Sequence, residues 1–251
     1  MMIRRFEEIS NNAWPAVQTI QYDGWLLRFA NGVTKRSNSV NLLYPSAMDP
    51  VEKIAFCEKM YQYRSITPCF KIAPVADPAD IDQILENRGY PVHSSISFQT
   101  MDLSSMAGTD KSNLSDGLST NINFVMTPGW MDNFIRMNGF DPARKETYIQ
   151  IMNLVSTPKC LVSVFHNNRF VGVGLGILED RFIGLFDIVV EPAFRNRGLG
   201  KRVVEIILHW GKKNGAKTAY LQVVSNNIPA LNLYRKSGFS EIYQYHYRMQ
   251  V

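Results

Sequence analysis

The sequence predicts an α/β protein (α+β, with a mixed sheet) built in two halves of similar design. Short β-branched, apolar segments typical of strands alternate with segments in which apolar residues recur at helical spacing. Between Phe186 and Gly211 the hydrophobic period changes from strand to helix across a loop with two glycines. The succession strand, helix, glycine, strand occurs near residue 89 and again near residue 238, which suggests a duplicated fold. A chance similarity is the alternative, because this succession is common.

Composition is that of a soluble globular protein. The 251 residues suffice for one large domain or two small ones, with 45% apolar and 20% charged residues. No apolar run approaches the roughly 20 residues that span a bilayer, and the first residues lack the apolar region of a signal peptide. We therefore expect a cytoplasmic protein with no membrane partner.

Cysteine and histidine residues are scattered along the chain. The 3 cysteines and 4 histidines show neither C-x-x-C nor H-x-x-x-H spacing. An odd number of widely separated cysteines is typical of reduced, buried thiols. We therefore expect no metal.

In the first half, apolar periodicity and turn residues predict alternating elements. Asp23-Gly24 and Asn31-Gly32 are turn signals, and the second is the strongest short hairpin signal in the chain. A first helix is expected to end within 13–20. The following helices are expected at 50–63 and 78–87, and the strands at 25–29, 39–43, 69–74 and 95–101.

Residues 102–121, rich in Ser, Gly, Asp and Asn, are expected to be a linker between an N-terminal domain, 1–101, and a C-terminal domain, 122–251. The second domain should contain strands at 123–126, 160–166, 169–178, 182–190, 219–224 and 241–249, and helices at 128–137, 142–155, after Gly200 and at 229–236. Gly172, Gly174 and Gly176 alternate within a predicted strand with no helix after it. This indicates a bulge or close packing rather than a dinucleotide site.

The loop that follows the strand ending near Glu191 has the features of an anion site. Gly198 and Gly200 let the backbone approach a ligand, and the first-turn N–H groups of a helix favour negative charge. In a chain of net charge +5, basic residues gather here: Arg195, Arg197, Lys201 and Arg202. Neither a G-x-x-x-x-G-K-[ST] loop nor a nucleic-acid-binding signature occurs. We expect a polyphosphate cofactor and no nucleic acid; an ordinary loop with solvated arginines is the alternative.

Two segments of the second domain carry longer patterns. They are VEPAFRNRGLG, Val190 to Gly200, and NIPALNLYRKSGF, Asn227 to Phe239. The first resembles the V-x-P and [RQ]-x-x-G-x-[GA] signature of the GCN5-related N-acetyltransferases (GNAT family), and the second resembles that family's N-x-x-A-x-x-x-Y-x-x-x-G-F signature. The resemblance covers about residues 121–251. It implies a GNAT fold and an N-acetyltransferase that carries an acetyl group from acetyl-CoA to a primary amine of a small molecule or peptide.

The resemblance also implies which residues hold acetyl-CoA. The backbone of Ile188, Val189 and Val190 would pair with the pantetheine arm and the thioester, and Asn227 would hydrogen-bond the same arm. The pyrophosphate would lie on a loop made of Arg195, Asn196, Arg197, Gly198, Leu199, Gly200 and Lys201. Tyr234 matches the family's general acid; a packed helix aromatic is the alternative.

The two signatures contain no residue that matches the family's general base. Some family members have a glutamate where this chain has Gln222, and an amide cannot accept a proton. Asp187, on the strand before the loop, is the nearest carboxylate and could act directly or through water. Glu179 and Glu191 are weaker candidates, and a structural role is the alternative for all of them.

The first half resembles a degenerate acetyltransferase-like domain. It has no counterpart of the loop from Arg195 to Gly200, and the alignment of Gly89 with Gly238 puts Leu85 opposite Tyr234. Two functions besides acetyl transfer stay open. One is a non-catalytic acyl-CoA-binding or regulatory protein, and the other is a transferase that uses a different acyl-CoA. The oligomeric state does not follow from the sequence.

Overall fold

The computed structural model describes residues 2–104, 106 and 117–250, and these residues form two compact units. Unit 1 comprises the chain up to Ser97, Gln150–Val155 and the residues from Tyr243 on; unit 2 comprises Phe98–Ile149 and Ser156–Ile242. Strands β5 (Val92–Asp102) and β11 (Ser240–Met249) each contribute residues to both units. The end of the chain therefore groups with its first residues, a long-range association that local patterns do not reveal.

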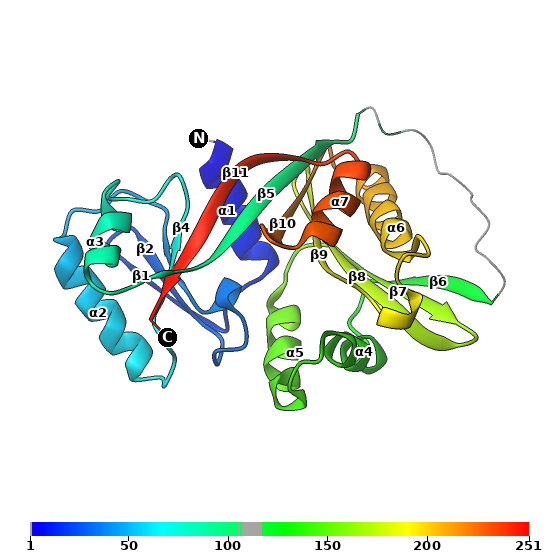
Figure 1. Ribbon diagram of the computed structural model, residues 1–251, viewed down its shortest axis with the longest axis horizontal. Coiled ribbons are helices and arrows are strands. Elements are labelled where there is room, and N and C mark those ends of the chain that lie inside the picture. Colours follow the sequence, from blue (N-terminus) through cyan, green and yellow to red (C-terminus); the bar gives the residue numbers. More distant parts are fainter. Residues whose placement is uncertain (1, 105, 107–116, 251) are drawn as a thin grey trace. The chain divides into compact units, whose positions relative to one another are not determined.

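Unit 1 is an α/β layer whose strands follow the order β1-β2-β3-β4-β11-β5 (Figure 1). Strands β1 to β3 form antiparallel neighbours, β3 runs parallel to β4, and β11 runs antiparallel to β4. The remaining elements of this unit are α1 (Met2–Ala13), β1 (Gln18–Tyr22), β2 (Trp25–Phe29), the 3₁₀ turn η1 (Lys35–Ser37), β3 (Val40–Leu42), α2 (Pro50–Gln62), β4 (Cys69–Ile72) and α3 (Ile81–Asn87).

The first helix differs from the prediction. α1 ends at Ala13, and residues 18–20 of the segment expected to close the helix belong to strand β1. Phe6, Ile9 and Ala13 are buried at helical spacing, so the amphipathic segment lies earlier than expected. Pro15 lacks an N–H group and ends the helical run. The chain after it is extended.

The hairpin signals were partly correct. Asp23 and Gly24 form the two-residue turn between β1 and β2, with Tyr22 opposite Trp25 and φ values of 40° and 82°. Positive φ at both turn residues is the geometry that suits strand twist. The Asn31-Gly32 connection is longer because it includes η1, although the expected return strand is confirmed as β3, antiparallel to β2.

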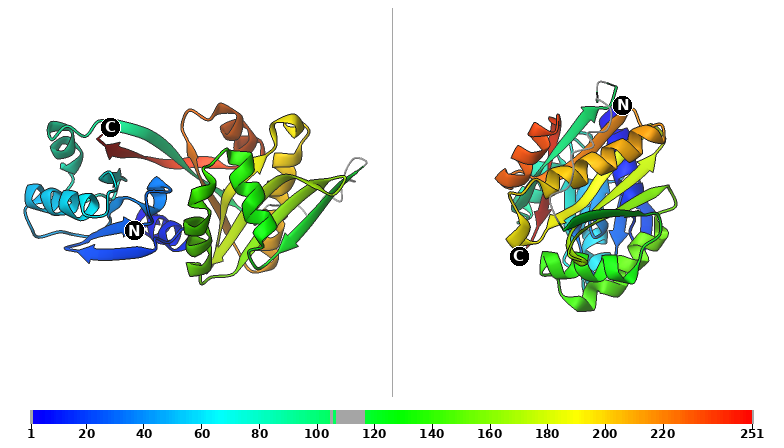
Figure 2. Two further views of the ribbon diagram at one scale, coloured as in Figure 1. Left: turned by 90° about the horizontal axis from the view of Figure 1, so that it is seen from below. Right: turned by 90° about the vertical axis from the view of Figure 1, so that its right-hand side faces the viewer.

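Unit 2 has the strand order β5-β10-β9-β8-β7-β6. β10 runs parallel to β9, whereas β6 to β9 are antiparallel neighbours. Figure 2 shows α4 and α6 on opposite faces of these strands. The elements are β6 (Leu118–Asn123), α4 (Pro128–Asn138), η2 (Pro142–Arg144), α5 (Lys145–Leu154), β7 (Lys159–His166), β8 (Arg169–Glu179), β9 (Phe182–Val190), η3 (Pro192–Phe194), α6 (Leu199–Lys213), β10 (Thr218–Val224) and α7 (Ile228–Lys236).

The strand expected at 123–126 was wrong. β6 covers 118–123 instead, and its residues 118–121 lie in the segment expected to be a linker. It pairs along its length with β7 at the edge of the sheet, from Leu118 opposite His166 to Asn123 opposite Leu161. An edge strand tolerates the polar residues that made this segment look like a loop. Residues 105 and 107–116 of the expected linker lie outside the described residues.

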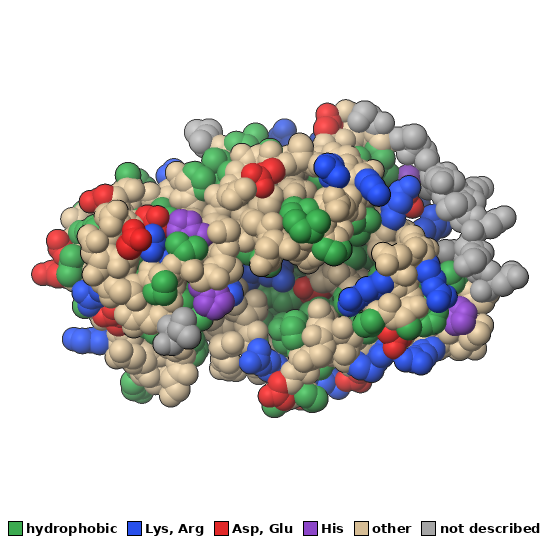
Figure 3. Space-filling model, in the orientation of Figure 1, with side chains coloured by type: hydrophobic (Ala, Val, Ile, Leu, Met, Phe, Trp, Pro, Cys, Tyr) green, Lys and Arg blue, Asp and Glu red, His purple; other side chains and the backbone are tan. Residues whose placement is uncertain are grey.

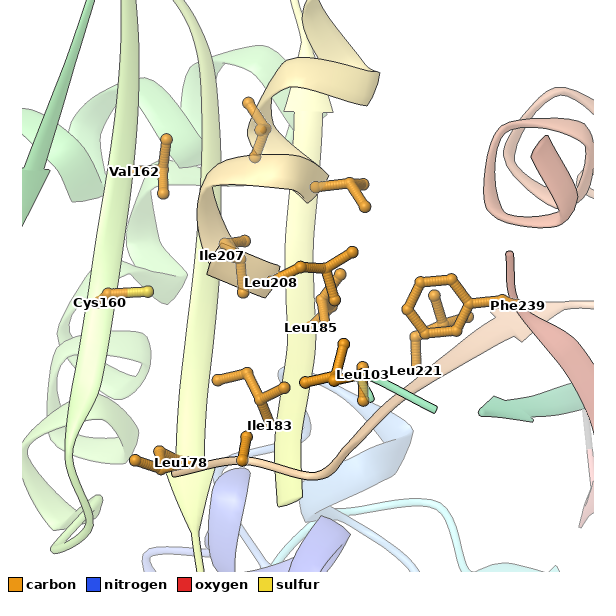
Figure 4. Packing of buried hydrophobic residues seen from close by; sticks show 14 of the residues in the cluster. Leu103, Cys160, Val162, Leu178, Ile183, Leu185, Ile207, Leu208, Leu221 and Phe239 are labelled. Carbon is orange, nitrogen blue, oxygen red and sulfur yellow. The ribbon is translucent and has the colours of Figure 1, made fainter. Parts of the chain in front are cut away.

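The alternating glycines of β8 mark close packing, as predicted. A Cβ atom at Gly174 would stand 2.3 Å from Val203 Cγ1, and one at Gly176 would stand 2.6 Å from Ile207 Cγ2. Since Cβ contacts below about 3 Å do not occur, α6 can lie on β8 only where side chains are absent. Figure 4 shows Ile207 and Leu208 of α6 facing the strand residues Cys160, Val162 and Leu185. This packing holds the start of α6 against the sheet.

Candidate functional site

A bulge in β9 is the first feature of the site. Val173 of β8 pairs with Val189, and Leu175 pairs with Phe186, so β9 has one residue more than β8 in this stretch. Asp187 lies within it and has a φ of 52°. The additional residue reverses the alternation of side chains. Ile188 and Val190 therefore pack on the same core cluster as Ile183 and Leu185.

The second feature is the separation of β9 from β10. Their parallel ladder runs from Phe182 opposite Thr218 to Leu185 opposite Leu221 and stops, although β9 continues to Val190. On its other side β9 remains paired with β8 as far as Val190. Peptide groups between 188 and 190 that face β10 therefore have no ladder partner there. Such groups can hydrogen-bond an extended ligand as a neighbouring strand would.

The third feature is the start of α6, where the chain turns sharply. Asn196 and Gly198 have φ values of 59° and 79°, and Gly198 is the N-cap residue, with no side-chain hydrogen bond to cap the helix. A Cβ atom at Gly198 would find no heavy atom within 4 Å. First-turn N–H groups that no side chain caps can bind an anion, and the helix dipole supports this.

Basic side chains surround this helix start. Arg195 Nε donates to Val190 O at 3.1 Å, and the Arg197 guanidinium lies 5.1 Å from the centre of the Phe194 ring. Lys201 Nζ lies 3.5 Å from Glu205 Oε1. Figure 3 shows Lys and Arg side chains gathered over the part of unit 2 that holds η3 and α6. The local field is therefore positive, as the sequence indicated.

Helix α7 carries most of the second signature and lies against the start of α6, where the first signature ends. Asn227 caps α7, its Oδ1 accepting from Ala230 N at 3.2 Å, which leaves its amide Nδ2 as a donor. Leu233 Cδ2 lies 3.3 Å from the position a Cβ at Gly200 would take, so α7 touches the first turn of α6. Tyr234 is half-buried, with its ring 6.0 Å from that of Phe239 in an edge-to-face arrangement.

The carboxylates expected as base candidates are not equivalent. Glu191 Oε1 lies 3.2 Å from Arg136 Nη1 and 2.5 Å from Arg169 Nη2, so it is held in ion pairs. Glu179 pairs with Phe182 at the opposite end of β9 from Val190, a separation of about 26 Å along an extended strand. Asp187, half-buried in the bulge, is the candidate nearest the strand separation; Gln222 is also half-buried, next to the last paired residue of β10.

Arg136 and Arg169 are site neighbours that the sequence analysis missed. They come from α4 and from the start of β8, 55 and 22 residues away from Glu191. No local pattern relates residues at such separations. Their pairing with Glu191 holds the residue that begins the basic loop.

The described residues offer neither a metal-binding cluster nor a membrane-spanning helix. No group of three or more His, Cys, Asp and Glu side chains among them has an arrangement that could hold a metal ion. None of the helices in the described ranges has the length and apolar character needed to cross a membrane.

The sequence is similar to those of known proteins. Residues 129–239 match the family model described as "Acetyltransferase (GNAT) family". The "Uncharacterized N-acetyltransferase YobR" of Bacillus subtilis is 31% identical over 99% of this chain and 98% of its own length. The chain belongs to the GNAT family. It is therefore an N-acetyltransferase, as the two signatures predicted.

Solved GNAT structures agree with the two-part fold. A GCN5-related N-acetyltransferase from Kribbella flavida superposes with a TM-score of 0.71 over 98% of this chain and 95% of its own, at 12% identity. A tandem GNAT protein from the clavulanic acid biosynthesis pathway gives a TM-score of 0.70 over 97% and 86%, at 11% identity. Residues 1–80 match a separate model, "Probable histone acetyltransferase Rv0428c C-terminal". These matches confirm the predicted fold class, a GNAT fold preceded by a GNAT-like N-terminal half.

Proposed function

We propose that this GNAT-family enzyme takes the acetyl group from acetyl-CoA and transfers it to a primary amine of a small molecule or peptide. The observation that carries the proposal is the strand separation after Leu185 and Leu221, next to the uncapped start of α6. An extended arm that ends in a pyrophosphate needs this combination: open peptide groups along one strand and N–H groups at a helix start.

The residues present fit such a ligand. N–H groups of the segment 196–201 would hold the pyrophosphate, with Arg195, Arg197 and Lys201 adding positive charge. The backbone of Ile188, Val189 and Val190 would pair with the pantetheine arm. Asn227 would donate from Nδ2, because its Oδ1 already caps α7.

Two side chains would transfer protons during the reaction. Acetyl-CoA supplies an acetyl group activated as a thioester. Tyr234 Oη would protonate the leaving sulfur: a phenol has a pKa of about 10 and a thiol about 8.5, so the transfer is uphill by about 2 kcal/mol. An amine, with a pKa of about 10, is mostly protonated at neutral pH. A carboxylate of Asp187 would accept that proton directly or through water.

A protein that binds acyl-CoA without turnover is the second candidate, since Gln222 stands where some members of the family have a glutamate. A transferase of a longer acyl group is a variant of the first. Calorimetry with acetyl-CoA followed by thiol release in a library of amines separates them. Binding with thiol release supports the proposal; binding without any release favours the second candidate, and no binding contradicts both.

A matched pair of glycine variants tests the phosphate loop. Gly198 and Gly215 flank α6, both have positive φ values, 79° and 97°, and a Cβ at either meets open space. The backbone strain of Gly→Val should therefore be similar at the two positions. We expect Gly198→Val to weaken acetyl-CoA binding about tenfold or more, as judged by calorimetry. Equal affinities in Gly198→Val and Gly215→Val would overturn the assignment of the loop.

A further inference from the structure

The sheet of unit 1 has two unlike faces. Val40, Leu42, Phe70 and Ile72 point to an apolar cluster shared with α2. The alternating residues point the other way. Asn41 pairs with Lys71, and Lys71 pairs with Tyr247 of β11, so these three form a row across neighbouring strands. Arg28 of β2 and Tyr245 of β11 lie on the same side, and these five residues are named the polar face.

The polar face is buried although it carries charge. Arg28, Asn41 and Lys71 are exposed by 3%, 1% and 5%. Lys71 Nζ pairs with Glu7 of α1, which is fully buried, and lies 4.0 Å from the centre of the Tyr245 ring. Tyr243 Oη donates to the other oxygen of Glu7 at 2.7 Å. Both oxygens of this carboxylate are thus engaged.

Positive charge is in excess on this face. The Arg28 guanidinium donates to neutral oxygens, those of Asn11, Trp14 and Arg36. Lys35 Nζ lies 5.7 Å from the Tyr247 ring and adds a further cation at the border. Two buried cations therefore share one buried carboxylate. Burial lowers the pKa of Arg28 to about 10 and lowers that of Lys71, a sign that the face would gain from an anion.

Buried polar atoms beside this face lack partners. Asn41 donates from Nδ2 to Ser39 O and Ser39 Oγ, both at 3.1 Å, but its Oδ1 is buried without a hydrogen bond. The Oγ atom of Ser37, in η1, is likewise buried without one, and η1 is tied to the face through Arg36 O. A network that serves only stability pairs its buried polar atoms, because each unpaired one costs free energy.

We propose that the polar face of unit 1 binds a small molecule with a carboxylate next to a hydrogen-bond donor, the head group of an amino acid. The carboxylate would lie toward the buried cations and accept from Ser37 Oγ. The ammonium group would donate to Asn41 Oδ1. This site lies within unit 1 and goes beyond the acetyl transfer proposed for unit 2, so either can fail without the other.

Matched ligand pairs test the proposal on the full chain without an acyl donor. Calorimetry and thermal melts compare L-lysine with cadaverine, L-serine with ethanolamine and L-phenylalanine with phenethylamine, pairs that differ only in the carboxylate. We expect at least one amino acid to bind and raise the melting temperature, and its decarboxylated partner to bind at least about tenfold more weakly. If no amino acid binds more tightly than its partner, the proposal is overturned.

Side-chain variants then assign the binding to this face. Asn41→Leu keeps the volume but removes the acceptor, and Ser37→Ala removes a hydroxyl at little risk to folding. Each should weaken the binding of the preferred amino acid, Asn41→Leu by about tenfold. Gln21→Leu, at an exposed position of β1, is the matched control and should bind normally. Unchanged affinity in both Asn41→Leu and Ser37→Ala overturns the proposal. The proposal is also overturned if the parent binds no amino acid and Asn41→Leu is more stable than the parent.

Discussion

Unit 1 and unit 2 end a helix in the same way. Gly89 follows α3 with a φ of 83°, and Gly238 follows α7 with a φ of 98°. The next residue is a buried aromatic in each case, and its N–H bonds five residues back: Tyr90 N to Leu85 O, and Phe239 N to Tyr234 O, both at 3.0 Å. This is the hydrogen-bond pattern of a Schellman ending. It makes Leu85 and Tyr234 structural counterparts.

The surroundings of these two endings differ. Unit 2 places an uncapped helix start and a separated strand pair near α7, above an apolar core. Among the described residues, the buried charged side chains all belong to unit 1: Glu7, Arg28, Lys53, Lys71 and Arg248. The two units therefore share a helix ending that contributes to folding. The proposed chemistry depends on the loop and the strand separation, and both lie in unit 2.

The largest expected effect concerns the buried charge of unit 1. Lys71→Met leaves Glu7 buried without its cation, so the free energy of unfolding should fall by about 3–5 kcal/mol. Urea denaturation measures this loss. Lys59→Met, at an exposed position of α2, is the control and should change stability by no more than about 0.5 kcal/mol. If Lys71→Met is as stable as the parent, the buried charge of unit 1 does not distinguish its energetics from those of unit 2.

The counterpart positions should differ in catalysis. Tyr234→Phe keeps the contact with the Phe239 ring but cannot donate a proton, so kcat should fall about 100-fold. KM for acetyl-CoA should stay unchanged, because the hydroxyl acts on the leaving sulfur. Steady-state thiol release measures both. Leu85→Met in unit 1 should leave kcat as it is, and a Tyr234→Phe enzyme of normal kcat would exclude this tyrosine as the general acid.

The glycines of β8 should matter through packing. Gly174→Ala puts a Cβ 2.3 Å from Val203 Cγ1 and should lower the free energy of unfolding by about 1–3 kcal/mol. At Gly129 a Cβ would have its nearest neighbour, an atom of Phe170, at 3.8 Å, so Gly129→Ala is a matched control in the same unit. Thermal melts compare the two. Equal melting temperatures would mean that the packing of α6 on β8 does not require a glycine at position 174.

The smallest effect concerns the turns. In unit 1, Asp23 accepts from Ala47 N and Met48 N and pairs with Lys53, and the Met48 N–H makes the largest contribution to lowering its pKa from 3.8 to about 2. A pKa lower in the folded chain than in the unfolded chain adds stability above about pH 4, and this is lost as the pH falls toward 2. Asp23→Asn should therefore be less stable than the parent at pH 6, and the difference should vanish near pH 2.

Unit 2 supplies the control for this pH dependence. Asp180 also has a positive φ, 53°, in the two-residue turn between β8 and β9, where it faces Arg181 at 3.7 Å. At pH 6, Asp180→Asn should change the stability less than Asp23→Asn does, because the Asp180 side chain is 58% exposed. If Asp23→Asn gives the same profile as Asp180→Asn, the contacts of Asp23 contribute nothing measurable.

Local patterns predicted most elements of both units. The helices at 50–63 and 128–137 and the strands at 160–166 and 182–190 agree with the structure to within a few residues. Periodicity and turn residues suffice there because they report which face of a segment is buried and where the chain turns. They failed at 13–20 and 123–126, where a proline and an edge strand decided the outcome. The roles of Tyr234, Asp187 and the loop residues stay predictions.

By itself the sequence determined the two signatures, the glycines that turn the chain and the alternation that gives each strand its faces, since these depend on neighbours a few residues apart. Only the tertiary structure decided the bulge at Asp187, the pairing of Glu191 with Arg136 and the burial of Glu7 against Lys71. Sheet register joins Met249 to Cys69, which are 180 positions apart, and an ion pair joins Arg248 to Asp82, which are 166 apart. Their energies depend on which strands become neighbours, and no local window of the sequence contains that information.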